Sequence, residues 1–209
     1  MRLLTVTSIA SLAAVVLMAL ACTAAPAELT TDIEATVEAR LAQEKTIEAT
    51  VEARLKTALT TQSLITAIDT EDAESVKEIL DSGINPNKNP VPEGFPLVGA
   101  YPLHLAVVKG NKEIVQMLLV YGAQIEGKAK NKDEATPLHW AAFFGQKDMI
   151  SLLINAGAPM NVLDSNHATP LDAAVYVWRL SQNDREQASH FMGIIEMLKA
   201  HGGKPADEL

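Results

Sequence analysis

A short motif that occurs three times at nearly constant spacing constrains the fold of this chain more than any other feature. The first copy begins at Tyr101 and reads Tyr-Pro-Leu-His-Leu-Ala, and the second begins 35 residues later at Thr136 as Thr-Pro-Leu-His-Trp-Ala. The third follows after 33 more residues at Thr169, as Thr-Pro-Leu-Asp-Ala-Ala. Sequence repeats of this period indicate a solenoid, in which each unit buries its apolar face against its neighbours.

The residues within and around each motif favour pairs of short helices. Proline is tolerated in the first turn of a helix, and the threonine before it can cap the helix. Alanines at 106, 141 and 174 are small enough to let adjacent helices approach closely. Glycines at 83, 122, 157 and 202 suit helix C-termini, where a left-handed residue is common.

These residues resemble the ankyrin repeat, whose signature runs T-P-L-H-x-A-A-x-x-G, then a leucine-rich helix, then G-A-x-x-N. The resemblance implies an all-α ankyrin-repeat solenoid of about four helix–turn–helix units over residues 63–205. Ser63 to Asn87 resembles an N-terminal cap with a shortened first part. In the fourth unit, Thr169 to Gly203, the second helix is expected to resume only at about Met192.

The chain departs from the family pattern at three points. The glycine that the family places three residues before the proline is Gly99 in the second unit, but Glu134 and His167 in the next two. Those two turns must adopt another conformation or bear strain. The insertion at 88–100, which contains three prolines, is expected to form an ordered irregular loop. The insertion at 178–189 is expected to extend or follow the preceding helix.

The N-terminal segment is typical of a secretory signal peptide over residues 1–21. A positively charged start at Arg2 precedes an uncharged apolar run from residue 3 to residue 20. The segment from Met18 to Cys22 resembles a bacterial lipobox, which implies a lipid on the Cys22 thiol, although Ala19 stands where leucine is usual. Cleavage by ordinary signal peptidase and an uncleaved membrane anchor are the alternatives. All three place the folded part outside the cytoplasm, as a membrane-anchored lipoprotein in the periplasm or at the cell surface, or as a secreted protein.

Residues 22–62 are predicted to form a lipid-anchored helical linker. An eight-residue sequence beginning at Ile33 recurs at Ile47, two heptads later, and neither Gly nor Pro occurs between 31 and 61. The linker is interpreted as a spacer, with oligomerisation through its apolar stripe as the alternative, because charged residues interrupt strict heptad seams. The stripe comprises Ile33, Val37, Leu41, Ile47, Val51, Leu55 and Leu59, and the interrupting residues are Arg40, Glu44 and Arg54.

Charge and motif content disfavour several classes of function. The formal net charge is −9 and no Lys/Arg cluster occurs, so a nucleic-acid partner is not expected. One cysteine allows no internal disulfide, and no Gly-rich phosphate loop, CxxC, HExxH or GxSxG sequence is present. We therefore expect neither a catalytic site nor a cofactor or metal.

The histidines are expected to be structural. The resemblance implies that His104 and His139, at the same motif position, hydrogen-bond neighbouring loops, and Asp172 holds the equivalent place in the fourth unit. His190 and His201 have no partner at a useful spacing and are expected at the surface.

The resemblance also implies a concave groove that binds a protein or peptide partner. The alternatives are that Phe144 and Val177 turn inward, and that the protein is a structural lipoprotein that oligomerises through the helical linker of residues 22–62 (the stalk). The groove positions carried over on the helices are Val108, Lys109, Phe143, Phe144, Tyr176 and Val177, and those on the loops are Leu97, Val98, Lys132, Asp133, Ser165 and Asn166.

Overall fold

The structure is a computed structural model that describes residues 27–88, 90–94 and 97–209. The predicted signal peptide and Cys22 lie outside these residues. The chain divides into two compact units, residues 1–55 and 56–209. Within the described ranges every regular element is a helix, as predicted. No helix in the described part of the chain has both the length and the apolar content needed to cross a membrane.

The first described element is α2, a helix of 43 residues from Ala27 to Asp69. It contains the expected linker helix and runs on without a break past residue 62. Its last turns are also the first helix of the N-terminal repeat, in which the aliphatic side chains become fully buried. The buried residues there are Leu64, Ile65, Ala67 and Ile68.

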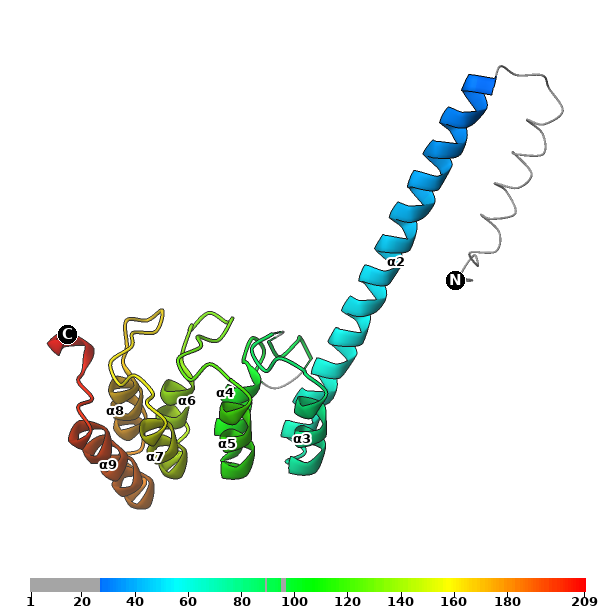
Figure 1. The fold of residues 1–209 in the computed structure, drawn as a ribbon. Helices are drawn as coiled ribbons and strands as arrows, with labels where there is room; N and C mark the ends of the chain where they lie inside the picture. Colours follow the sequence, from blue (N-terminus) through cyan, green and yellow to red (C-terminus); the bar gives the residue numbers. More distant parts are fainter. Residues whose placement is uncertain (1–26, 89, 95–96) are drawn as a thin grey trace. The chain divides into compact units, whose positions relative to one another are not determined.

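The unit from residue 56 to 209 continues with short helices in antiparallel pairs (Figure 1). Helix α3 (Ala73–Asp81) completes the first repeat, and α4 (Pro102–Lys109) pairs with α5 (Lys112–Val120). The third repeat contains α6 (Pro137–Phe143) and α7 (Lys147–Asn155), and the fourth contains α8 (Pro170–Leu180) and α9 (Arg185–Ala200). Helices α4, α6 and α8 each begin at the motif proline after a residue in an extended conformation, as the helix-start chemistry predicts.

The prediction that the second helix of the fourth repeat resumes at about Met192 is wrong. Helix α9 begins at Arg185, because the side chain of Asp184 accepts hydrogen bonds from the backbone N–H groups of Glu186 and Gln187 and so caps the helix. The insertion at 178–189 therefore divides into an extension of α8, a short turn, and the first turn of α9.

The turns before the motif prolines keep the left-handed conformation that the family glycine would adopt. The φ angles are 82° at Gly99, 47° at Glu134 and 57° at His167. Of the two outcomes predicted for the non-glycine turns, the strained one is therefore observed. Gly99 has a second reason to be glycine, since a Cβ atom there would collide with the carbonyl oxygen of Lys130.

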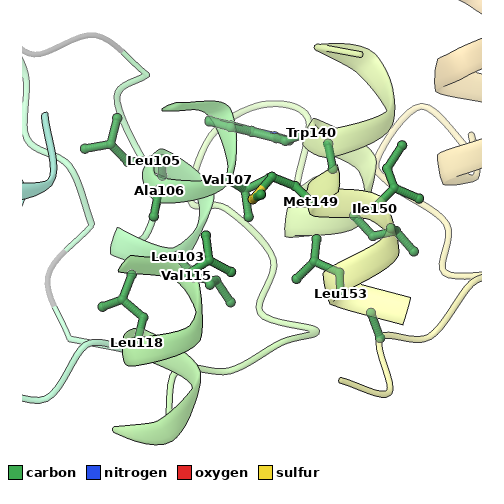
Figure 2. Close-up of a cluster of buried hydrophobic side chains, with 14 of the residues drawn as sticks. Leu103, Leu105, Ala106, Val107, Val115, Leu118, Trp140, Met149, Ile150 and Leu153 are labelled. Carbon is green, nitrogen blue, oxygen red and sulfur yellow. The ribbon is translucent and has the colours of Figure 1, made fainter. Parts of the chain in front are cut away.

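The core consists of aliphatic side chains from successive repeats, packed into one continuous layer. Val107 of α4 and Met149 of α7 lie between the second and third helix pairs (Figure 2). Leu118 of α5 and Leu153 of α7 are completely buried on the same layer. Each repeat therefore buries its apolar face only by stacking on the next.

The last repeat is covered by the C-terminal segment of the chain. The hydroxyl of Thr169 donates to the carbonyl of Lys204 at 2.9 Å, and the backbone N–H of Ala206 donates to the carboxylate of Asp172 at 2.9 Å. Asn161 donates to the carbonyl of Gly202 and accepts from the N–H of Lys204. These bonds hold a short 3-10 turn, η1 (Ala206–Glu208), near the N-terminus of α8.

Candidate functional site

An aromatic groove lies over the third and fourth repeats. Its volume is 810 Å³, and its lining comes from α6, α8, the loops before them, and Leu97 in the loop before α4. Three of the predicted groove residues contribute exposed rings: Phe143 and Phe144 are each 44% exposed and Tyr176 is 56% exposed. Phe144 therefore does not turn inward, contrary to the alternative considered from the sequence.

The rings of the groove contact one another in a connected row. Phe143 of α6 and Tyr176 of α8 are stacked, with centroids 6.4 Å apart and an interplanar angle of 15°. Phe144 meets Phe143 and Trp140 edge-on, at centroid distances of 5.3 and 6.2 Å. Trp140 is itself buried and meets the His104 ring edge-on at 5.1 Å, so the exposed rings stand on a buried aromatic base.

The polar lining of the groove is mainly acidic. Asp133, Asp164 and Asp172 line it, whereas Arg179 is the cationic residue in its lining among the described residues. Asp164 and Asp172 accept hydrogen bonds from neighbouring backbone N–H groups. The carboxylate of Asp133 has no such partner among the described residues and is exposed to solvent.

The other three predicted helical positions are not part of the aromatic groove. Val108 and Val177 are half-buried and pack against the core. The Nζ atom of Lys109 lies 2.7 Å from a carboxylate oxygen of Asp69 and donates to the carbonyl of the same residue at 2.9 Å. Lys109 thus connects α4 to the end of α2.

Only some of the predicted loop positions line the groove. Leu97, Asp133 and Asn166 line the groove. Ser165 instead joins two loops, because its N–H donates to the carbonyl of Asp133 and its hydroxyl donates to that of Lys132. Val98 is exposed outside the lining. Sequence reasoning missed Arg179 and Asp164, although α-helical spacing of three residues from Tyr176 could have indicated Arg179.

The prediction that the motif histidines bond neighbouring loops is confirmed. The backbone N–H of Tyr101 donates to Nδ1 of His104, so Nε2 carries the proton and donates to the carbonyl of Ala135 at 3.0 Å. His139 makes the equivalent bond to the carbonyl of Ala168 at 3.0 Å. Burial lowers the pKa of His104 to about 4 and also lowers the pKa of His139. Both rings are therefore neutral near pH 7.

His190 and His201 lie at the surface, as predicted. His190 is exposed and its Nε2 atom lies 2.7 Å from the carbonyl of Gly145, and His201 is exposed beside the carbonyl of Met197. In the described part of the chain no group of three His, Cys, Asp or Glu residues is arranged to hold a metal ion.

Comparison with known proteins agrees with the repeat geometry. The family model for ankyrin repeats (3 copies) matches residues 64–164 and 103–182, which together span more than half of the chain. No curated protein matches the sequence. The matched residues include the motif prolines, the bonded histidines and both groove helices. The chain belongs to the ankyrin-repeat family.

Proposed function

We propose that this protein is a membrane-anchored scaffold outside the cytoplasm that captures a segment of a partner protein in the groove over α6 and α8. Ankyrin repeats generally mediate protein–protein interaction, and proteins built from them are typically non-enzymatic scaffolds. The observation that carries the proposal is the row of exposed rings formed by Phe143, Phe144 and Tyr176. Aromatic side chains at the centre of a surface depression are common sites of high binding energy.

The composition of the groove favours a partner segment of particular chemistry. The rings would bury an apolar side chain, and the face of the Phe143–Tyr176 stack attracts a cation. Three aspartates face one arginine in the lining, so a lysine or arginine beside the apolar residue would be electrostatically favoured. The partner segment is therefore proposed to carry an apolar residue flanked by positive charge.

The anchor belongs to the proposal as well. The apolar segment before Cys22 and the lipobox-like residues support export and acylation of this thiol. Mass spectrometry of the protein purified from membranes would test this point. A lipid on an N-terminal Cys22 is expected, whereas an unacylated N-terminus at Glu28 would refute the anchor and leave the groove untouched.

The groove is tested with matched glutamate substitutions in the chain from residue 23 onward. Phe143→Glu combined with Tyr176→Glu should abolish retention of the partner from membrane extract while leaving the helical circular dichroism unchanged. Val120→Glu is the control, because Val120 of α5 is 83% exposed and lies outside the groove lining.

Partner retention by the control but not by the double variant is the expected result, and the retained protein is then tested as a purified ligand. Raised salt should weaken its binding, because part of the attraction is electrostatic. Equal retention by both variants would contradict binding in the groove. Loss of helical signal in the double variant would identify the rings as core residues.

A further inference from the structure

Within the unit of residues 1–55, the stalk carries an apolar stripe with exposed side chains. Leu41 is 39% exposed, Ile47 is 55% exposed and Val51 is 58% exposed. These residues belong to the compact unit of residues 1–55. Aliphatic side chains spaced along one face of a long helix favour burial against another helix.

Between Val37 and Val51, the heptad positions of this stripe are interrupted by two charges of opposite sign. When Val37 and Val51 are placed at position a, Ile47 falls at position d, and the intervening layers contain Arg40 at d and Glu44 at a. Both charged residues are exposed. Neither takes part in the salt bridges found among the described residues, which join Lys77 to Asp81 and Lys109 to Asp69.

The direction of pairing decides whether these charges repel or attract. In a parallel, in-register pair, position a faces position a and position d faces position d, so Glu44 would face Glu44 and Arg40 would face Arg40. In an antiparallel pair, position a faces position d of the other helix. With the twofold axis near residue 42, Arg40 faces Glu44 twice, and Val37 faces Ile47 twice.

We propose that the stalk binds a second copy of this chain as an antiparallel helix pair centred near residue 42. In this register every apolar layer between Val37 and Ile47 meets an apolar layer, and each charged layer meets its opposite. Leu41, which flanks the seam at position e, lies beside Leu41 of the other copy and adds apolar contact at the centre. The surface is separate from the groove, so the pairing holds or fails independently of the proposed partner binding.

The first test is a charge exchange in the chain from residue 23 onward, which retains every described residue. Sedimentation equilibrium should give a dimer for the unaltered chain. Glu44→Arg should raise the dissociation constant of the dimer at least about tenfold, because each copy then places Arg40 opposite an arginine. Adding Arg40→Glu to the same chain should restore the dimer, since the opposite charges face each other again.

The second test determines direction by disulfide formation, since the chain from residue 23 contains no cysteine. Leu41→Cys should cross-link two copies on oxidation. Ile47→Cys should not, because its two copies would lie about 15 Å apart along the antiparallel pair at 1.5 Å per residue. In a parallel pair the Ile47 positions face each other, so the two variants should give the reverse result.

Several outcomes would overturn the proposal. A monomer at high micromolar concentration, including one that binds lipid vesicles through the stalk, would show that no second copy covers the stripe. A dimer unaffected by Glu44→Arg would place the contact elsewhere. Cross-linking of Ile47→Cys but not Leu41→Cys would establish a parallel pair. Circular dichroism of each variant verifies that its helix content is unchanged.

Discussion

The repeat domain and the stalk are both built from amphipathic helices, yet only the repeat domain buries its apolar stripes. Leu118 and Ile150 are completely inaccessible in the stacked repeats, whereas Ile47 and Val51 in the stalk are largely exposed. The repeats return every 33 to 35 residues with turns between them, so each stripe meets another from the same chain. The stalk sequence returns after 14 residues along one unbroken helix, which cannot fold back on itself. The period of an internal repeat therefore decides whether burial occurs within one chain.

The largest expected effect on stability comes from removing side-chain volume, and it should differ between the two regions. Leu118→Ala should lower the free energy of unfolding of the repeat domain by about 3 kcal/mol, because it leaves a cavity in a fully buried layer. Val51→Ala in the stalk should change it by less than about 0.5 kcal/mol, since this side chain is exposed. Urea denaturation of both variants measures the difference, and equal losses would show that the stalk stripe is part of the same core.

Acid should weaken the repeat domain through His104, a buried titratable group of a kind not found on the exposed stalk segment. Its pKa is about 4 in the folded protein and 6.5 in a model peptide, so the unfolded chain binds the proton more tightly. The contribution of His104 to stability should therefore fall by about 3 kcal/mol as the pH decreases from about 6.5 to about 4, and then level off.

This slope is measured by urea denaturation at a series of pH values. His104→Gln should be less stable at pH 7 but should lose the part of the slope that His104 contributes, and the part that remains is assigned to His139, whose pKa burial also lowers. An unchanged slope in that variant would assign the acid sensitivity to other groups.

Substitutions at two glycines with similar backbone conformations allow the cost of a steric contact to be separated from the cost of backbone strain in the repeat domain. Gly99→Ala should cost about 2 kcal/mol or more, because the new Cβ would approach the Lys130 carbonyl as well as occupy a left-handed conformation. Gly83→Ala should cost only about 1 kcal/mol, since φ is similar but no atom lies within 4 Å of the new Cβ. Thermal denaturation compares them, and equal costs would mean that the Lys130 loop moves aside.

The smallest effects are expected from substitutions to glycine, which should change stability in opposite directions in the two regions. Glu134→Gly should stabilise the repeat domain by about 0.5 kcal/mol, because glycine adopts the observed φ of 47° without strain. Glu48→Gly in the stalk should weaken the helix by about 1 kcal/mol, since helical backbone disfavours glycine. Melting of the domain and far-ultraviolet circular dichroism of the stalk are the respective measurements. Destabilisation in both places would show that the Glu134 turn is relaxed.

The features that a local motif encodes could be predicted from the sequence. The Thr-Pro-Leu-His residues predict where α4, α6 and α8 begin, and the histidine bonds between repeats follow from the family resemblance. The start of α9 was missed because Asp184 lies within a stretch interpreted as an insertion, although its capping chemistry was visible.

The groove was predicted only in part, because exposure depends on packing between repeats. Phe143, Phe144 and Tyr176 occupy the expected surface, but Val177 is one residue further along α8 and packs against the core. Lys109 is held by Asp69, 40 residues earlier, a contact that no local pattern indicates. The acidic lining combines Asp133 and Asp164, from loops of different repeats, with Asp172 of α8, and it is apparent only once these elements are brought together.

The bonds from Thr169, Asp172 and Asn161 to the C-terminal segment also limit how this protein could be engineered. A further repeat fused after Leu209 would find the polar groups of the fourth repeat already occupied by Lys204 and Ala206. Lengthening the array at this end therefore requires removal of the segment first, so that the incoming repeat can take over its hydrogen bonds. Insertion of a repeat between α7 and α8 would keep this terminus intact and is the more suitable route to a longer scaffold.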